Sequence, residues 1–266
     1  METKLISSVQ NPLVKKLLLL KEKSRERRKT GLFVAEGRRE IELAKKANYT
    51  IDTLVFCPEI LNEPISKTFF SSVKKEPIQT SKQVYEKIAH RGTTEGILAI
   101  LKSKEHGVEN IQFKNTHPLI LVAEAPEKPG NVGALLRTAD AANLDAVLIA
   151  NPKSDLYNPN IIRSSLGCVF TNQIGMGTSE QIIAFLKEKD VKIYCATLTA
   201  SKNYTLSSFK GSTAIVVGTE ATGLSRNWIN NSDENIIIPM QGKIDSMNVS
   251  VSAAILIFEA KRQRGI

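Results

Sequence analysis

The sequence predicts an α/β protein with two domains, the second built on a parallel sheet covered by helices on both faces. Beyond residue 117, five short apolar runs alternate with helical segments, which is the pattern of strands buried on both faces. The first hundred residues repeat the order helix, strand in smaller units. Between them, residues 105–116 are polar and without periodicity. We therefore expect domains at 1–104 and 117–266, joined by a linker at 105–116.

The first domain is expected to begin with a helix at Asn11, because asparagine caps helices well and Pro12 fits the first helical turn. This helix should run to about Gly31, a residue typical of helix C-terminal ends. The pattern predicts further helices and strands in alternation. The strands are expected at 32–35, 51–56, 77–80 and 96–101, and the helices at 36–47, 58–70 and 81–89.

The second domain is expected to form a Rossmann-like, doubly wound sheet, with ligand sites at the carboxyl ends of its strands. The predicted strands are 119–122, 146–149, 191–194, 214–217 and 236–238. The predicted helices are 132–142, 160–166, 179–189, 225–230 and 249–264.

The charge balance is basic: the chain of 266 residues has a formal net charge of +9 and a pI of about 9.4. Between Lys15 and Arg39 there are ten basic residues and three acidic ones. A solvated helix face would explain such a run, but clustered arginines and lysines also supply most of the affinity for a polyanion. We expect this segment to bind phosphates. The arginines assigned to that surface are Arg25, Arg27, Arg28, Arg38 and Arg39.

Other compositional features indicate a cytoplasmic protein. Three cysteines, an odd number and far apart, fit reduced, buried thiols better than disulfides or a zinc site. The three histidines have no ligand spacing, so no metal is expected. No apolar run reaches the ~20 residues of a membrane helix, and the first residues do not resemble a signal peptide.

The loop after the first strand of the second domain contains Gly130 and Gly133, which let backbone approach a ligand closely. Arg137 lies one turn further along the same helix face. It follows two leucines and precedes Thr138 and Ala139, a setting in which an arginine needs a specific partner. An ion pair, for example with Asp140 or Asp145, is the structural explanation, and a contact to a phosphate or hydroxyl is the functional one.

Two later loops stand at the ends of later strands. Residues 218–224 place glycines on both sides of Glu220. The stretch 246–251 follows a strand and a polar loop and opens the last helix, where unpaired N–H groups can face a ligand. Taken alone, Ser246 or Asn248 would be read as a helix cap.

Together these loops resemble the three motifs of the SpoU (TrmH) branch of the SPOUT methyltransferases. In order, the chain carries NVGALLRTA at 131–139, GTEATGL at 218–224 and IPMQGKIDSMNVSVSA at 238–253. The resemblance extends over roughly 118–264. The segment FVAEGRREIELA at 33–44 is similar to the ribosomal-protein-like substrate-binding domain of the same family. One departure is Met247, where many relatives have leucine, a change that conserves volume.

The resemblance implies transfer of a methyl group from S-adenosylmethionine to a ribose 2′-OH in RNA, by a homodimer whose C-terminal segment forms a trefoil knot. Strand and helix patterns alone would not predict a knot, since chains do not normally thread loops. The implied cofactor contacts are Gly218, Ile238, Met247, Asn248 and Val249. The implied catalytic residues are Arg137, Asn131, Glu220, Ser246 and Asn248, with Arg163 as a further RNA contact.

Arg137 matches the catalytic arginine of the family. A guanidinium stays protonated in proteins, so we expect this side chain to hold the target phosphate and stabilise the developing alkoxide rather than to act as a base. The last helix is apolar almost all round from Val249 to Phe258, so it is expected to be buried on more than one side. An intrachain core would explain this, but the resemblance implies that the helix is partly a dimer interface, which is the interpretation we favour.

By analogy with the family, whose tRNA-modifying members usually carry short terminal extensions, the resemblance implies that the appended N-terminal domain favours large-subunit (23S) ribosomal RNA as the substrate. A tRNA 2′-O-methyltransferase, a non-catalytic RNA-binding protein of the same fold and a small-molecule methyltransferase are the alternatives. The last of these would leave the basic N-terminal segment without a function. The sequence does not name the nucleotide that is modified.

Overall fold

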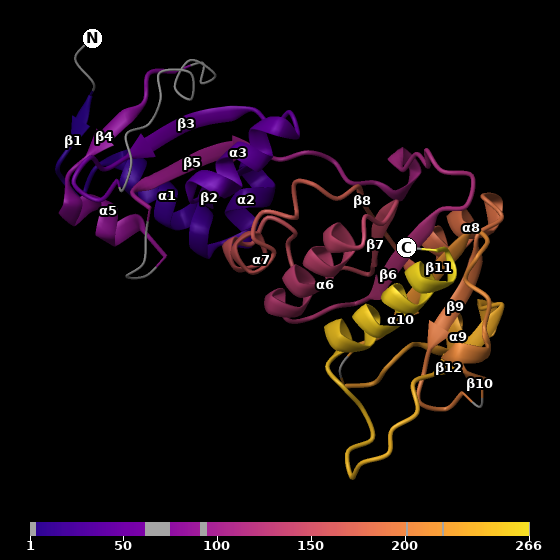
Figure 1. Ribbon diagram of the computed structural model, residues 1–266. Helices are drawn as coiled ribbons and strands as arrows, with labels where there is room; N and C mark the ends of the chain where they lie inside the picture. Colours follow the sequence, from indigo (N-terminus) through magenta and orange to yellow (C-terminus); the bar gives the residue numbers. More distant parts are fainter. Residues whose placement is uncertain (1–3, 62–74, 91–94, 201, 220, 266) are drawn as a thin grey trace. The chain divides into compact units, whose positions relative to one another are not determined.

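The structure is a computed structural model that describes residues 4–61, 75–90, 95–200, 202–219 and 221–265. The chain divides into two compact units (Figure 1). The first comprises Met1–Glu105 with Asp155–Thr171, and the second His106–Ser154 with Asn172–Ile266. The ranges 1–104, 105–116 and 117–266 stay a prediction for the domains, and residues 155–171 pack with the first unit although they lie far along the chain. In the described residues, no helix is long and apolar enough to cross a bilayer.

The first unit contains a five-stranded sheet in the order β1-β4-β3-β5-β2. β5 pairs antiparallel with both β2 and β3, whereas β4 pairs parallel with β1 and β3. The strands are β1 (Leu5–Ile6), β2 (Leu32–Glu36), β3 (Ile51–Phe56), β4 (Ile78–Thr80) and β5 (Ile97–Lys102). The helices are α1 (Pro12–Glu22), α2 (Ser24–Thr30), α3 (Arg38–Lys46), α5 (Lys82–Ile88) and α7 (Pro159–Ser164).

The first helix differs from the prediction because it is broken at Lys23, which adopts an extended conformation with φ −109° and ψ 107°. The predicted ends are confirmed: the Asn11 side chain caps α1, and Gly31 ends α2 with φ 63°. The break leaves carbonyl groups at the end of α1 without helical partners. The buried Arg27 guanidinium satisfies two of them, donating to the carbonyl oxygens of Leu20 (2.7 Å) and Lys21 (3.1 Å). Of the predicted helix at 58–70, residues 62–70 lie outside the described residues, and residues 58–61 are not helical.

Residues 155–171 join the first unit through an aromatic cluster. The ring of Tyr157 stacks on Phe33 with centroids 4.2 Å apart, and Phe170 meets the edge of Tyr49 at 5.1 Å. The hydroxyls of Tyr49 and Tyr157 lie 3.1 Å apart and share a hydrogen bond. Because these rings carry no sequence periodicity, their meeting could not be predicted from the chain alone.

The second unit contains a seven-stranded sheet in the order β10-β12-β9-β11-β6-β7-β8, and all its pairs are parallel. The predicted parallel sheet is confirmed. The strands are β6 (Leu119–Glu124), β7 (Ala146–Ala150), β8 (Ile174–Gly177), β9 (Lys192–Ala196), β10 (Lys202–Asn203), β11 (Thr213–Val217) and β12 (Glu234–Ile237). The helices are α6 (Pro129–Ala141), α8 (Ser179–Glu188), α9 (Arg226–Asn231) and α10 (Val249–Gln263), with short 3₁₀ turns η1 (Val108–Asn110) and η2 (Tyr204–Leu206).

Two strands of this second sheet were not predicted. β8 has two glycines among its four residues, and β10 has only two residues at the sheet edge, so neither produces a continuous apolar run. The predicted linker also contributes to the core of the second unit: Val108 and Ile111 are buried there, and Gly107 pairs with Met176.

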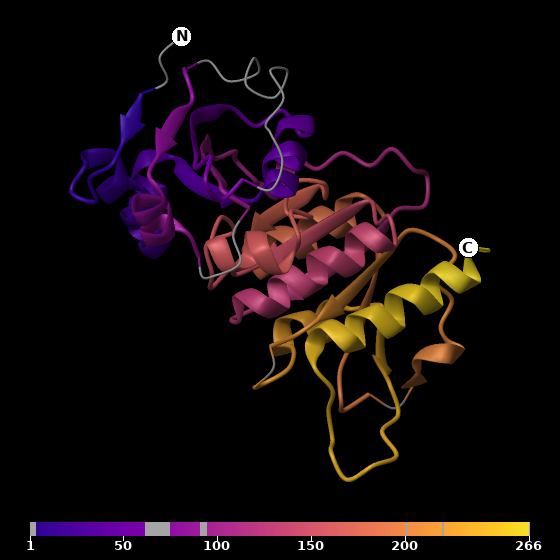
Figure 2. The ribbon, with the colours of Figure 1, turned by 60° about the vertical axis from the view of Figure 1, so that its left-hand side comes forward.

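Helices cover both faces of this sheet. Figure 2 shows α6 and α10 side by side over one face. The other face packs against α8 and α9 through a core that includes Ile182, Phe185 and the fully buried Trp228. This doubly wound arrangement brings the ends of β6, β11 and β12 to one edge, where the three predicted loops begin.

Candidate active site

The N-terminal ends of α6 and α10 are linked by a pair of asparagines. Asn248 caps α10: its Oδ1 accepts from the Ser250 backbone N–H at 2.9 Å and from the Ser250 hydroxyl at 2.6 Å. Its amide nitrogen donates to Oδ1 of Asn131 at 3.2 Å. The predicted cap is therefore present, and the same side chain joins the first and third motif loops. Val249, the first residue of α10, follows directly.

The second motif loop is a tight turn after β11. Thr219 and Gly223 exchange two backbone hydrogen bonds, at 3.0 and 3.1 Å. A Cβ at Gly218 would overlap the Gly223 carbonyl group, and Gly223 itself has φ +68°. Both glycines are therefore required by the turn itself. Glu220, which the sequence assigns to catalysis, lies outside the described residues.

The buried carboxylate of Glu124 holds the end of this loop by hydrogen bonds, and the sequence analysis did not identify this residue. Glu124 ends β6 and is only 6% exposed. One of its oxygens accepts from the Ser225 backbone N–H at 2.8 Å, just after the loop, and the other from the Ser179 hydroxyl at 3.2 Å. Trp228 Nε1 donates to the same hydroxyl at 2.9 Å. The sequence feature that could have identified Glu124 is its position as a charged residue at the end of an otherwise apolar strand.

The third motif loop offers backbone groups to a ligand. Among the described residues, 239–247 form no backbone–backbone hydrogen bond, and Figures 1 and 2 show an extended loop between β12 and α10. Ile238 and Met247 are half-buried at its two ends, while Ser246 is exposed and, within the part of the chain that the structure describes, donates only to Asp245, at 3.1 Å. Unpaired amides and carbonyls beside apolar side chains suit a largely uncharged nucleoside group, so these residues fit the adenosine part of S-adenosylmethionine.

Arg137 is exposed on α6, six residues or about 1.7 turns beyond Asn131. Its guanidinium forms no hydrogen bond or ion pair with any described residue, so the structural explanation by Asp140 or Asp145 finds no support. Asp145 instead accepts from the Asn115 side chain and from the Leu119 backbone. Arg137 is thus available to a ligand. Among the described residues, the structure brings Asn131 and Asn248 together, and it places neither Arg137 nor Ser246 in hydrogen-bonding contact with them.

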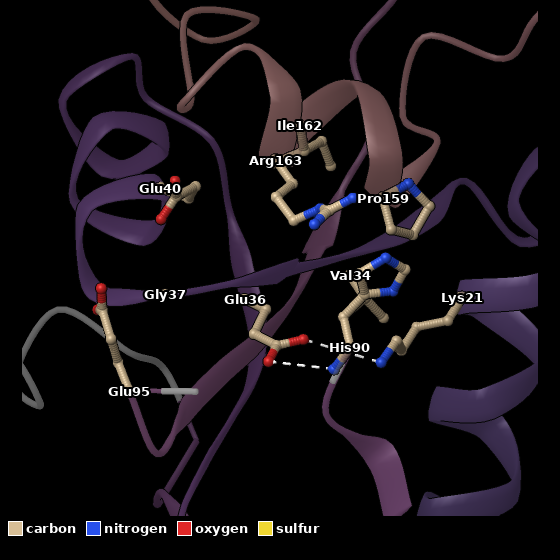
Figure 3. Close-up of a pocket in the computed structure, with 10 residues that line it drawn as sticks. All are labelled: Lys21, Val34, Glu36, Gly37, Glu40, His90, Glu95, Pro159, Ile162 and Arg163. Atoms are coloured by element: carbon tan, nitrogen blue, oxygen red, sulfur yellow. Dashed lines mark hydrogen bonds and ion pairs between the residues drawn. The ribbon is translucent and has the colours of Figure 1, made fainter. Parts of the chain in front are cut away.

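The predicted RNA-binding arginines separate into two groups. Arg27 is 5% exposed and forms an ion pair with Asp155, 2.5 Å between Nε and Oδ2. This assignment is corrected: burial and internal bonding make Arg27 a structural residue. The side chains of Arg25, Arg28 and Arg39 are exposed, whereas Arg38 is half-buried and pairs with Glu42 at 3.5 Å. Arg163 on α7 is exposed and lines a cavity of the first unit (Figure 3).

Comparison with known proteins identifies both parts of the chain. The SpoU rRNA Methylase family matches residues 118–258, and the MRM3-like substrate binding domain matches residues 11–99. The chain is 30% identical over 263 residues to the 23S rRNA (guanosine(2553)-2′-O)-methyltransferase RlmP of Bacillus subtilis strain 168, covering 97% of this chain and 99% of that protein.

Solved structures agree with this classification. A crystal structure of an RNA 2′-O ribose methyltransferase is 35% identical, with a TM-score of 0.85, and the match covers 98% of this chain and all of the other. The S-adenosylmethionine-bound rRNA methyltransferase of Sinorhizobium meliloti, 23% identical with a TM-score of 0.88 over 98% of both chains, has the same fold.

The fold and site define a methyltransferase of the SPOUT class. The chain belongs to the SpoU rRNA methylase family, and it is an RNA 2′-O-ribose methyltransferase. The recognition made from the three motifs is confirmed.

Proposed function

We propose that this enzyme methylates a ribose 2′-OH in large-subunit ribosomal RNA, in the cytoplasm. The observation that carries the proposal is the exposed Arg137, without a partner among the described residues, on the helix whose N-terminal end is joined to the cofactor loop by the Asn131–Asn248 bond. Full-length similarity to a 23S rRNA methyltransferase, substrate-binding domain included, supports ribosomal RNA over tRNA.

The residues have separate tasks in this chemistry. Bound S-adenosylmethionine supplies an electrophilic methyl group on a sulfonium. The backbone of the loops that begin at Gly218 and Ile238 holds the nucleoside, and Asn248 fixes the loop end nearest α10. The Arg137 guanidinium binds the RNA backbone and stabilises the negative charge that develops on the attacking ribose oxygen, since a charge-assisted donor acts most strongly where charge appears in the transition state. Ser246 and Glu220 complete the proposed ribose contacts.

The first unit provides the proposed RNA-binding surface. Arg25 and Arg28 project from α2, and Arg39 from α3, all exposed. Phosphate contacts of this kind position RNA without reading its sequence. With Arg27 removed from this set, the surface is smaller than the sequence indicated.

Homodimerisation through α10 and a knotted C-terminal segment are part of the same proposal. Val251 and Phe258 lie seven residues apart on α10 and are 47% and 52% exposed. That spacing puts both on one helix face, where a second copy would cover them. The Asn248–Asn131 bond, which joins the end of the 239–247 loop to α6, is consistent with a threaded chain.

The test of this function is methyl transfer from labelled S-adenosylmethionine to purified ribosomal RNA and tRNA, followed by mapping of 2′-O-methyl positions. Label in large-subunit RNA at a defined ribose is expected. Label in tRNA would establish the alternative substrate instead. Absence of S-adenosylmethionine binding in calorimetry would support a non-catalytic RNA-binding protein and overturn the proposal.

A further inference from the structure

The first unit contains a cavity of about 260 Å³ that the proposed methyl-transfer chemistry does not use. It is enclosed by β2, the ends of α1 and α5, the start of α3, and α7. Figure 3 shows the Glu36 carboxylate at its centre, with Lys21 and His90 on one side and Glu40 and Glu95 on the other. The volume lies just below the ~300–1,000 Å³ of pockets for drug-sized ligands. The cavity therefore fits a single ring system rather than a whole cofactor.

The Glu36 carboxylate is only partly satisfied. One oxygen accepts from the His90 backbone N–H at 3.2 Å. The other is buried and accepts no hydrogen bond from any described residue. The Lys21 ammonium forms an ion pair with it at 3.8 Å, too long for a hydrogen bond, and donates its hydrogen bond to the Ile88 carbonyl. Buried acceptors are nearly always paired, so this oxygen has a counter-charge but lacks a hydrogen-bond donor among the described residues.

The opposite wall offers donors and flat surfaces. Arg163 contributes a guanidinium that forms no hydrogen bond or ion pair with a described residue, and Figure 3 shows it between Pro159 and Ile162. Burial lowers the pKa of His90, as do the neighbouring Lys21 and Arg163 charges, whereas Glu36 and a hydrogen bond with Asn160 raise it. Together with the apolar side chains of this wall, the imidazole ring provides faces against which a planar group can stack.

The charges exclude some ligands and favour others. Three carboxylates, those of Glu36, Glu40 and Glu95, line the cavity and would repel a phosphate. A neutral planar group that has hydrogen-bond donors on one edge and acceptors on another would satisfy both walls. Among the RNA bases, guanine has this combination: its O6 and N7 are the acceptors that arginine binds with two hydrogen bonds, and its N1–H and N2–H₂ groups are donors that suit a carboxylate.

We infer that this cavity binds one unstacked guanine of the RNA, with N1–H and N2–H₂ directed to Glu36 and the O6/N7 edge directed to Arg163. The inference rests on the proposed function, since it assumes an RNA substrate. Sequence-specific RNA recognition typically targets such splayed-out bases, which stack on histidine or arginine and are read on both edges. The site would give the first unit base specificity in addition to the phosphate contacts of its arginines.

Single-atom changes in the RNA test this assignment with the unaltered protein. The probes are short, fluorescein-labelled oligouridines with one guanosine, and matched oligomers in which inosine or 7-deazaguanosine replaces it. Inosine lacks the N2 amino group, and 7-deazaguanosine lacks the N7 acceptor. Because phosphate contacts are the same in all probes, affinity differences measured by fluorescence anisotropy report the base alone. Guanosine is expected to bind about tenfold more tightly than either analogue, within the range for a bidentate base contact.

Two variants test which side chain contacts which edge of the guanine base. Glu36→Gln should remove the preference for guanosine over inosine and keep the preference over 7-deazaguanosine, whereas Arg163→Gln should do the reverse. The control is Glu86→Gln, since Glu86 is exposed on α5 and does not line the cavity. This variant should retain the preference for guanosine over both analogues. Thermal unfolding of each variant shows whether it is folded. If Glu36→Gln does not fold, the analogue series and Arg163→Gln decide.

The inference is overturned if the intact protein binds the guanosine and inosine probes equally, or if a folded Glu36→Gln variant keeps full discrimination. Methyl transfer to ribosomal RNA, measured in parallel, separates this result from the proposed function. An enzyme that methylates ribosomal RNA without guanosine preference in the binding assay would disprove the inference alone. Guanosine preference without methyl transfer to any RNA would disprove the proposed function alone.

Discussion

The side-chain amide of Asn248 donates to Oδ1 of Asn131 across 3.2 Å, while Oδ1 of Asn248 accepts from the Ser250 backbone N–H in the first turn of α10. One residue thus caps a helix and joins two loops that lie 117 positions apart in the sequence. The two roles use different atoms, so substitutions can separate them.

Asn248→Asp should preserve stability and weaken S-adenosylmethionine binding. Aspartate caps helices as well as asparagine does, but it cannot donate to Asn131. Asn248→Ala loses both roles and should also lower the free energy of unfolding by ~1 kcal/mol, or about 2–4 °C in Tm for a chain of this size. Calorimetry for affinity and thermal unfolding for stability check both variants. Equal cofactor affinity in wild type and Asn248→Asp would contradict the positioning role of the Asn131 bond.

Arg137→Ala should bind S-adenosylmethionine normally and transfer methyl groups about 10²–10³ times more slowly, the usual loss for one transition-state donor. Because Arg137 is exposed and unpaired among the described residues, the Tm of the Arg137→Ala variant should be nearly equal to that of the wild-type enzyme. Arg137→Lys, which keeps the charge without the planar fork, should recover part of the rate. Single-turnover transfer of labelled methyl groups gives the measurement. A wild-type rate in the alanine variant would remove Arg137 from the chemistry.

Asp155→Ala should destabilise the first unit by ~3 kcal/mol, because it leaves the Arg27 guanidinium buried without its counter-ion. The two side chains are 4% and 12% exposed. Replacing both, as Arg27→Met with Asp155→Leu, removes the unpaired charge but leaves the Leu20 and Lys21 carbonyls without their donor, so it should restore only part of the loss. Urea unfolding measures these differences. Glu188→Ala, which removes an exposed pair with Lys189, is the control and should change stability by less than ~0.5 kcal/mol.

Phe258→Glu should convert the enzyme to a monomer by placing a charge in the proposed α10 interface. The matched control is Leu206→Glu, which alters another exposed apolar residue, in η2. Light scattering at micromolar concentration gives the oligomeric state. The dimer proposal fails if the wild-type enzyme is itself a monomer, or if both variants remain dimers.

Acid should destabilise the C-terminal end of α10 through Glu259. Hydrogen bonds from Arg262, and then from Gln263, lower the pKa of this carboxyl from 4.5 to about 2. The unfolded chain therefore takes up the proton at a higher pH than the folded chain does. The stabilisation is present above pH 4.5 and is lost as the pH falls towards 2. Since Arg262 is 72% exposed, the effect should not exceed ~1 kcal/mol.

The measurement is Tm as a function of pH for the wild-type enzyme and for Glu259→Gln. The two curves should be separated at neutral pH and converge as the pH approaches 2. Curves that stay parallel over this range would show that Glu259 does not contribute to the pH dependence.

The strands and helices of the second unit were predictable because each predicted strand is a continuous apolar run and most helices begin at a recognisable cap. The three motif loops could be assigned because their glycines, asparagines and polar residues stand at strand ends. β8 was missed because its glycines interrupt the pattern. Arg27 was misassigned because a charged residue in a basic segment has the same sequence signature whether it is exposed or paired inside the fold.

The sequence by itself determined the class of enzyme, the parallel sheet and the position of the three motif loops, because these depend on local composition and on short motifs. Only the tertiary structure decided that Asn248 bonds to Asn131, that Glu124 holds the turn after β11, and that Glu36, His90 and Arg163 line one cavity. Such contacts join side chains dozens of residues apart, and their partners are selected by packing and burial, for which a linear pattern contains no signal.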